Sequence, residues 1–228
     1  MIGRADKSLV VHTTLYRPGT PIAANVAAPR VPPRVPPRDW RVSLPALTGP
    51  GVILRELRGA DARSLFALLT TEEVVRFISP PPISVEGFET FIAWARTKRA
   101  AGQYVCFGIV PHGYDTAVGL VQIQMPSGGA TEWGFALGAP FWSTGLFSAS
   151  ANAVLDFAFG HMGLEQLGAR AAVVNDRGNS ALRKLGAVRE GLLPASFVRN
   201  GRLLDQYYWT LTPDDRPRRK IVWETPAH

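Results

Sequence analysis

Apolar residues along residues 52–211 fall either at helical spacing or in short runs between turn residues, and this pattern predicts the elements. Short apolar runs separated by turn residues predict strands over residues 52–57, 104–110, 117–125, 131–137 and 167–174. Helical spacing predicts helices over residues 62–69, 72–78, 84–102, 148–162 and 178–185. Residues 196–199 and 203–211 form a hairpin, in which Asn200-Gly201 supplies the positive-φ turn.

Helix starts and stops support these boundaries. Asp61 is the expected N-cap of the helix over residues 62–69, and Ser84 is the expected N-cap of the longer helix after it. The run Pro80-Pro81-Pro82 ends the helical stretch between them. Antiparallel strands come first and a strand–helix–strand crossover follows, in the order β-α-α-α-β-β-β-α-β-α-β-β. This order predicts an α+β fold whose mixed, mostly antiparallel sheet lies between helices.

Basic residues are concentrated near the N-terminus. The 228 residues carry a formal charge of +7, with a pI near 10.1. Residues 1–50 hold seven basic and two acidic residues with nine of the 19 prolines, whereas residues 51–212 hold 14 basic and 13 acidic residues. A repeated Val-Pro-Pro-Arg unit favours an extended conformation there. We therefore expect a Pro/Arg-rich, largely flexible extension (1–50), one nearly neutral domain (51–212) and a C-terminal tail (213–228).

Several classes of protein are disfavoured by composition. No apolar run approaches the roughly 20 residues of a membrane-spanning helix, and the N-terminus has no signal-peptide core. The single cysteine, Cys106, cannot form an internal disulfide and reads as a small buried residue. Four scattered histidines have no zinc-ligand spacing, so no metal is expected. The expected protein is cytoplasmic and acts without membrane contact, as a monomer or homodimer. Nucleic acid, which could bind only the tail, is not an expected partner.

A candidate anion site lies between the strand over residues 131–137 and the helix that follows it. A strand that leads through a short loop into a helix presents unpaired main-chain N–H groups at the positive end of the helix dipole. Gly145 in this loop would let the backbone approach a phosphate closely. Ordinary turn chemistry is the alternative reading. Neither a P-loop nor a dinucleotide-binding glycine motif is present.

Residues 50–212 resemble the GNAT superfamily of acyl-coenzyme A-dependent N-acyltransferases, in particular the branch of ribosomal-protein N-terminal acetyltransferases. Glu132-Trp-Gly-Phe-Ala-Leu137 is similar to the E-x-G-[YF]-x-L strand of that branch. Phe141-Trp-Ser-Thr-Gly-Leu-Phe147 is similar to its [YF]-W-G-x-G-[YIL]-[AG] loop. Asn175, the later Leu-Arg-Lys-Leu-Gly186 and Glu190-Gly191 match its last motifs in order and spacing.

The resemblance implies a GNAT-like fold and an acetyl-CoA site. The main chain of the strand before the loop would pair with the pantetheine arm and face the thioester carbonyl. The loop would hold the pyrophosphate, and two asparagines would contact the arm or, alternatively, cap the helix. The implied cofactor-binding residues are Phe135, Ala136, Leu137, Trp142, Thr144, Gly145, Leu146, Phe147, Asn175 and Asn179.

This chain departs from the family pattern at four positions. Ser143 replaces the first glycine of the loop, and Phe147 stands where Ala or Gly is usual. Leu182 occupies the position of a frequent tyrosine acid, and Gly178 that of a frequent serine. A dedicated acid is not required, because a thiol of pKa about 8.5 leaves readily as thiolate. Tyr207 or Tyr208, whichever faces inward, is a weak candidate for that role.

Glu132 is our candidate general base, since a carboxylate of raised pKa suits deprotonation of an amine. An exposed strand carboxylate is the alternative reading. Phe88, Phe91 and Trp94 could wall the acceptor site, with core packing as the alternative. His161 is expected to complement the dipole at a helix end.

Three functions remain open from the sequence. The first is transfer of an acetyl group from acetyl-CoA to a primary amine, such as a protein N-terminus, an amino acid or a small-molecule amine, by direct attack in a ternary complex. The second is a non-catalytic, acyl-CoA-binding regulatory domain. The third is a nucleic-acid or protein-docking module that acts through the Arg/Pro-rich tail.

Overall fold

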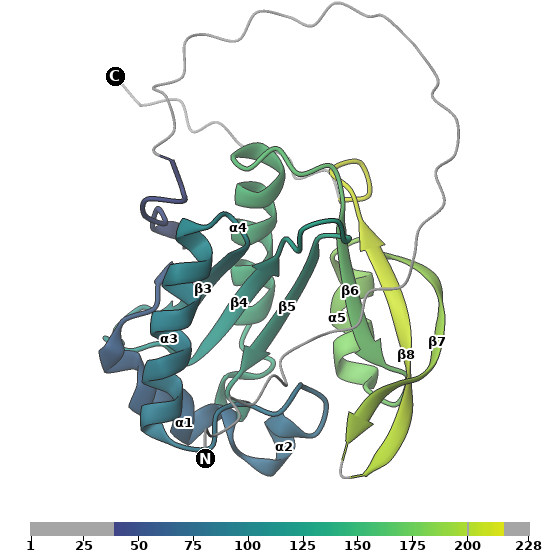
Figure 1. Ribbon diagram of the computed structural model, residues 1–228, viewed down its shortest axis with the longest axis horizontal. Coiled ribbons are helices and arrows are strands. Elements are labelled where there is room, and N and C mark those ends of the chain that lie inside the picture. Colours follow the sequence, from purple (N-terminus) through teal and green to yellow (C-terminus); the bar gives the residue numbers. More distant parts are fainter. Residues whose placement is uncertain (1–38, 200, 217–228) are drawn as a thin grey trace, which may run out of the picture.

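The fold is built on one mixed sheet of eight strands, in a computed structural model that describes residues 39–199 and 201–216 (Figure 1). The strand order is β1-β2-β3-β4-β5-β6-β8-β7, and every neighbouring pair is antiparallel except β5 and β6. The strands are β1 (Leu47–Gly49), β2 (Val52–Glu56), β3 (Tyr104–Pro111), β4 (Gly119–Gln124), β5 (Glu132–Leu137), β6 (Leu167–Ala172), β7 (Val188–Arg199) and β8 (Arg202–Leu211). The predicted α+β class with a mostly antiparallel sheet is confirmed.

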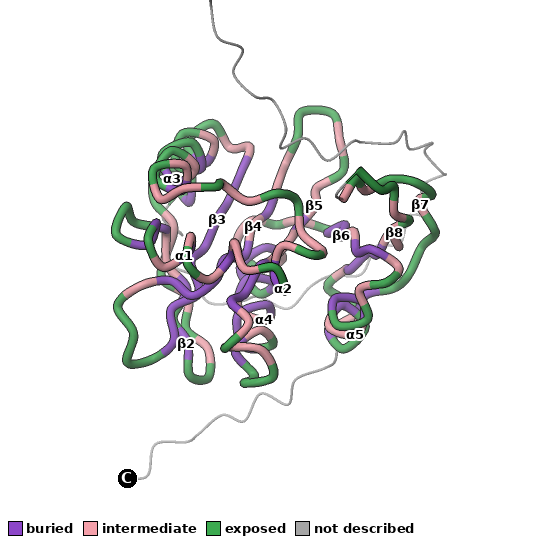
Figure 2. The backbone as a smooth tube through the Cα atoms, turned by 90° about the horizontal axis from the view of Figure 1, so that it is seen from below, coloured by how far each residue is buried: buried purple, intermediate pink, exposed green. Residues whose placement is uncertain are grey.

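Two helical layers cover the sheet. The helices are α1 (Ala62–Leu69), α2 (Glu72–Val75), α3 (Val85–Ala100), α4 (Leu146–Gly160) and α5 (Asp176–Lys184), with 3-10 turns at Gly59–Asp61 and Ala139–Phe141. One apolar core joins the sheet to α4 and α5, and a second joins its other face to α1 and α3. Figure 2 shows the central strands and the inner side of α4 buried, while much of β7 is exposed.

The order of elements matches the sequence prediction, with differences at element ends. Asn175 caps α5, which therefore begins at Asp176, and α4 begins two residues before the predicted start. The helix predicted over residues 72–78 ends at Val75. β7 begins at Val188 rather than at residue 196, because irregularities in its pairing with β8 interrupt the alternation that strand prediction uses.

The sheet also extends before residue 51, where we expected the domain to begin. β1 pairs with β2, and Trp40 lies in the core. Arg99 holds this segment through an ion pair with Glu56 and hydrogen bonds to the carbonyl oxygens of Trp40 and Arg41. The predicted extension up to residue 38, Asn200 of the hairpin turn and the tail from residue 217 lie outside the described residues. In residues 39–199 and 201–216, no helix is both long and apolar enough to cross a membrane.

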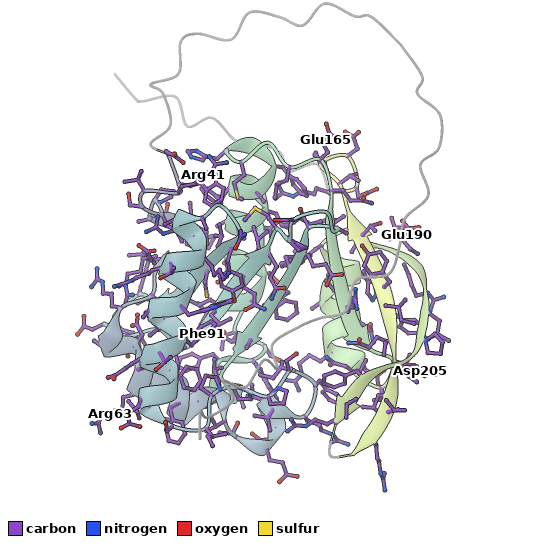
Figure 3. All side chains as sticks on the ribbon, viewed as in Figure 1. Arg41, Arg63, Phe91, Glu165, Glu190 and Asp205 are labelled. Carbon is purple, nitrogen blue, oxygen red and sulfur yellow. The ribbon has the colours of Figure 1, made fainter. Side chains whose placement is uncertain are left out.

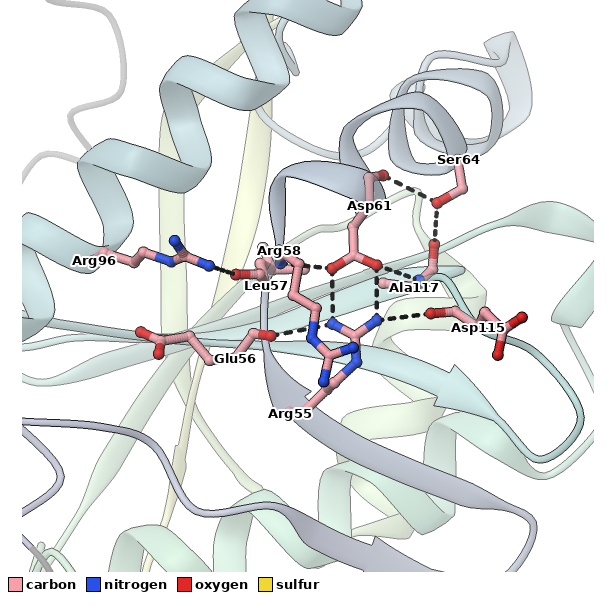
Figure 4. A network of polar contacts seen from close by, with 9 residues as sticks. All are labelled: Arg55, Glu56, Leu57, Arg58, Asp61, Ser64, Arg96, Asp115 and Ala117. Atoms are coloured by element: carbon pink, nitrogen blue, oxygen red, sulfur yellow. Dashed lines mark hydrogen bonds and ion pairs between the residues drawn. The ribbon is translucent and has the colours of Figure 1, made fainter.

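Asp61 is the N-cap residue of α1, as predicted, but its side chain makes no capping hydrogen bond and instead connects the start of the helix to the sheet (Figure 4). Its fully buried carboxylate accepts two hydrogen bonds from Arg55, at 2.8 and 2.9 Å. It also accepts from the main-chain N–H groups of Arg58, at 2.7 Å, and Ala117, at 2.9 Å. Burial alone would raise the pKa of Asp61, but these hydrogen bonds and the Arg55 charge outweigh it and lower the pKa.

We predict that Asp61→Asn lowers the free energy of unfolding by about 3–5 kcal/mol, because it leaves the partly buried Arg55 without its counter-ion. Since the folded-state pKa of Asp61 is lowered, its contribution is present above the unfolded value of about 3.9 and is lost as pH falls further. Urea unfolding followed by circular dichroism at pH 7 and pH 3 measures both effects. The exposed Asp39→Asn is the control and should change little; equal losses in the two variants would refute the role of Asp61.

Candidate active site

The site begins where β5 separates from β6. β5 pairs with β4 at six positions, from Glu132 opposite Gln124 to Leu137 opposite Gly119. It pairs with β6 only at Glu132, opposite Gly168, and the two strands then diverge (Figure 1). Alternate main-chain N–H and C=O groups of β5 therefore face an opening rather than a neighbouring strand. Such an edge can pair with an extended ligand as an added strand would.

A cleft of about 1090 Å³ occupies this opening. One wall is β5 with the loop that leads into α4, and the other is β6 with α5. Residues 76–82, after α2, and α3 close one end, and β7 contributes residues 196–198. Figure 3 labels Phe91, which lines the cleft from α3. It also labels Glu190 on β7, the strand at the far edge of the sheet.

The N-terminus of α4 forms the part of the cleft wall whose geometry suits an anion. Gly145, the N-cap, has φ +86°, a conformation that favours glycine. Within the described part of the chain, the N–H groups of Phe147 and Ser148 have no hydrogen-bond acceptor. Gly145, Phe147 and Ser148 all line the cleft. Free N–H groups at the positive end of a 15-residue helix suit a phosphate.

The loop before α4 is held by its own side chains. The Trp142 indole N–H donates to the Leu137 carbonyl oxygen at 2.8 Å, and the Arg177 guanidinium lies 3.8 Å from the centre of the Trp142 ring. This contact connects the two walls of the cleft. Ser143 has φ +62°, so the residue that replaces the family glycine keeps a backbone conformation typical of glycine.

Two of the predicted loop residues do not face the cleft, and their side chains hold the loop in place instead. The Thr144 hydroxyl donates to the Phe141 carbonyl oxygen at 2.7 Å, and the Leu146 side chain packs in the core. Neither residue is part of the cleft lining. Any contact of Leu146 with a ligand would therefore come from its main chain.

The two predicted asparagines differ in role. Asn175 lines the cleft, and its side-chain oxygen accepts from the Gly178 N–H at 2.9 Å, which caps α5. Asn179 does not line the cleft, contrary to its predicted role. Its amide donates to the Ala172 carbonyl oxygen at 2.9 Å and accepts from the Trp209 indole at 3.1 Å. These bonds join α5 to β6 and β8 and engage both ends of the buried amide.

Glu132 lies in the cleft at the point where the strands separate. Its atom Oε1 accepts from Arg170 Nε at 3.1 Å and from Nη2 at 2.8 Å, and its side chain is 17 % exposed. Burial raises the pKa of Glu132, while the Arg170 charge and hydrogen bonds oppose the rise, and the net shift is upward. Trp133, next along β5, packs in the core with α4.

The remaining candidates separate into cleft and core residues. Tyr208 is opposite Arg170 across β6 and β8, and burial, then the Glu132 charge, raises its pKa. Tyr207 packs against the core that joins the sheet to α4 and α5, and the Arg189 guanidinium lies over its ring. Phe88 and Phe91 line the cleft, but Trp94 does not. Cys106 is buried as expected, and His161 stacks on Phe157 at the end of α4.

The sequence analysis missed several residues of the cleft. Arg170, Arg177, Gln122 and Gln124 all line it. Arg170 carried a usable signal, because it is a lone charge in the otherwise apolar strand LGARAA. Of the predicted catalytic and cofactor-binding residues, eight line the cleft, namely Glu132, Phe135, Ala136, Leu137, Trp142, Gly145, Phe147 and Asn175.

The sequence pattern of the family described as "Acetyltransferase (GNAT) domain" matches residues 52–188, so the chain belongs to this family and is an acyltransferase. GNAT enzymes use acetyl-CoA. Among curated relatives, the uncharacterized N-acetyltransferase YoaA of Bacillus subtilis is 24 % identical, over 73 % of this chain and 96 % of its own. The uncharacterized N-acetyltransferase p20 of Bacillus licheniformis is 26 % identical, over 69 % of this chain and 90 % of its own.

Solved structures share the fold. RimJ of Mycobacterium smegmatis, determined in complex with CoA-disulfide, has a TM-score of 0.67 at 21 % identity, covering 76 % of this chain and 88 % of its own. The ribosomal-protein-S5-alanine acetyltransferase of Vibrio fischeri has a TM-score of 0.64 at 17 % identity, covering 76 % of this chain and 99 % of its own. The resemblance to GNAT acyltransferases stated from the sequence is thus confirmed.

We predict that Gly145→Glu abolishes acetyl-CoA binding, because it places a carboxylate where the pyrophosphate would lie. Gly128→Glu is a matched control, since Gly128 has φ +80°, and an added Cβ meets no atom within 4 Å at either position. Both variants should lose about 1–2 kcal/mol of stability from the left-handed conformation. Isothermal titration with acetyl-CoA measures binding. Intact binding in Gly145→Glu would show that the anion site is assigned wrongly.

Proposed function

We propose that this acyltransferase transfers an acetyl group from acetyl-CoA to a primary amine by direct attack in a ternary complex. The observation that carries the proposal is a single cleft that combines an open strand edge, a helix N-terminus and a half-buried carboxylate. These three features correspond to the three needs of the reaction, which are an aligned thioester, a bound pyrophosphate and a proton acceptor.

The residues of the cleft fit acetyl-CoA. The coenzyme supplies an acetyl group activated as a thioester. In this proposal, the main chain of β5 over Phe135, Ala136 and Leu137, whose alternate N–H and C=O groups face the opening, holds the pantetheine arm. The N–H groups of the first turn of α4 bind the pyrophosphate beside Trp142, and Asn175 contributes from α5. Asn179 is left out of this set because the protein itself engages its amide.

Glu132 is the proposed general base. As the amine nitrogen forms its bond to the acetyl carbon, the carboxylate takes the proton that the nitrogen loses, directly or through water. The upward shift of the Glu132 pKa brings it closer to neutral pH, where a base works best. Sulfur leaves as the thiolate and regains a proton from the carboxyl group, so Glu132 returns to its starting state.

The acceptor amine would enter on the α3 side of the sheet. Glu132 and Gln122 are on this face, as are Phe88 and Phe91 of the cleft wall. A protein N-terminus, an amino acid and a small-molecule amine are all compatible with these groups. The ribosomal-protein acetyltransferase among the structural neighbours supports a protein N-terminus as the first class to test.

We expect Glu132→Gln to lower kcat by about 10²–10⁴-fold, since a general base contributes that much, while acetyl-CoA binding is retained. Thiol release with a panel of alkylamines and tripeptides measures turnover, and isothermal titration measures binding. Glu73→Gln is the control, because Glu73 lines the same cleft from α2. If Glu73→Gln lost turnover and Glu132→Gln kept it, the base would be Glu73.

A further inference from the structure

Arg170 has a role that the acyl-transfer scheme above does not use. It is a charged residue in the middle of β6, with its side chain 11 % exposed and small apolar neighbours, Ala169 and Ala171, in the core. Burying an arginine is costly unless its charge is balanced and its N–H groups are bonded. Its partner is Glu132, so the two charges neutralise each other inside the cleft.

The geometry of the pair is asymmetric. Both Arg170 contacts, from Nε and Nη2, go to the same carboxylate oxygen, Oε1 of Glu132. Within the described chain, Oε2 accepts no hydrogen bond from the protein. An arginine that binds one oxygen through two N–H groups restricts rotation of the carboxylate and leaves the second oxygen available.

We propose that Arg170 is a positioning residue, which fixes Glu132 through Oε1 and directs Oε2 to the acceptor amine as the proton-accepting atom. This inference rests on the proposed role of Glu132 as the base. To that role the inference adds three things: the residue that orients Glu132, the oxygen of Glu132 that receives the proton, and the cation that balances the Glu132 charge.

The position of the pair in the sheet supports this role. Glu132 and Gly168 form the one registered pair between β5 and β6, and Arg170 lies two residues further along β6 on the same face. The ion pair therefore spans the strands where their hydrogen bonding stops. Gly168 leaves room for Tyr208, whose hydroxyl would lie 2.5 Å from a Cβ added at that glycine. Tyr208 thus packs close beside the pair.

The charges around Glu132 make Arg170 its main electrostatic partner. Across the described residues, Arg170 is the one cation within 4 Å of the Glu132 carboxylate. β4 presents the uncharged Gln124 directly opposite Glu132, and β8 presents Tyr208. Glu190 of β7 is close enough to Tyr208 for its charge to raise the Tyr208 pKa, and it accepts a hydrogen bond from the Thr210 hydroxyl at 2.6 Å.

Other charges line the same cleft without contacting the pair. Glu73 and Arg76 come from the α2 end, and Arg177 and Lys184 come from α5. No ion pair joins any of these four to Glu132 or Arg170 in the part of the chain described. Loss of Arg170 would leave Glu132 half-buried without a counter-ion, and its pKa would rise further.

The test measures the carboxylate directly and needs no known acceptor. Enzyme labelled with ¹³C at the glutamate carboxyl carbons is titrated by NMR, and the Glu132 signal is the one missing from Glu132→Gln. In Arg170→Gln we expect its pKa to rise by about one unit or more, a tenfold change in proton affinity. Arg170→Lys keeps the charge and should give a smaller shift.

Kinetics then separate positioning from a purely structural effect. With the tripeptide or alkylamine of highest turnover, Arg170→Gln should lower kcat at least tenfold while KM for acetyl-CoA stays within about twofold, because orientation acts on the chemical step. The acidic limb of the pH profile that depends on Glu132 should move upward with its pKa. Arg170→Lys should restore part of kcat.

Arg99→Gln is a matched control. Arg99 is equally buried, with 10 % of its side chain exposed. Its Nε lies 2.6 Å from Oε1 of Glu56, and this ion pair is outside the cleft. It should lower the melting temperature without changing the Glu132 titration. If Arg170→Gln does not fold, the comparison of Arg170→Lys with wild type provides the same test.

Two results would overturn the proposal. The first is a Glu132 signal that titrates at the same pH with and without Arg170. The second is a raised Glu132 pKa with unchanged kcat, which would make the pair purely structural. If Glu132→Gln itself kept full turnover, both the base and its positioning would be refuted. Binding of acetyl-CoA without thiol release by wild-type enzyme would instead count against the proposed function.

Discussion

The end of hydrogen bonding between β5 and β6 is the constraint on which the site depends. After the pair of Glu132 and Gly168 the strands separate, and β4 is then the one strand among the described residues that pairs with β5. Unpaired main-chain groups in a cleft are costly unless water or a ligand satisfies them, so this edge is prepared for an extended partner. The crossover from β5 through α4 to β6 also places the N-terminus of α4 beside the opening. One topological feature therefore provides both the strand edge and the anion site.

Keeping the cleft open requires that each wall be stable by itself. β1 to β5 are covered by α1 and α3 on one face and α4 on the other, and Asp61 connects the start of α1 to the sheet. On the other side, Asn179 joins α5 to β6 and β8 through both ends of its amide. Two polar residues that the sequence assigned to other roles, Asp61 as a helix cap and Asn179 as a cofactor contact, thus stabilise the walls. A buried amide or carboxylate must be fully bonded, and here the bonds go to the protein.

The order of elements could be predicted because the helices show helical spacing of apolar residues and the strands are short apolar runs between turn residues. β7 was underpredicted since its pairing irregularities interrupt the alternation that strand prediction uses, and the three residues of β1 are too few for a period. That Glu132, Gly145 and Asn175 lie together in one cleft could be predicted from motif spacing. Arg170 could be noticed as a lone charge in an apolar strand, but its pairing with Glu132 and that of Arg177 with Trp142 could not be predicted, because these partners are distant in sequence. Asn179 was misassigned for the same reason: a motif cannot show that Trp209 already occupies its oxygen.

The cleft is more cationic than the domain that contains it. The domain is nearly neutral, yet Arg76, Arg170, Arg177 and Lys184 line the cleft with only two carboxylates, Glu73 and Glu132. A cationic cleft favours an anionic coenzyme, but it would also lower the pKa of a catalytic carboxylate and weaken it as a base. Burial at the point where the strands separate counteracts this effect on Glu132 and raises its pKa. Pairing with Arg170 then limits the rise and neutralises both charges locally. In the proposed reaction, the remaining cations would act on phosphates elsewhere in the cleft, and the raised pKa of Glu132 would suit a proton acceptor for an amine.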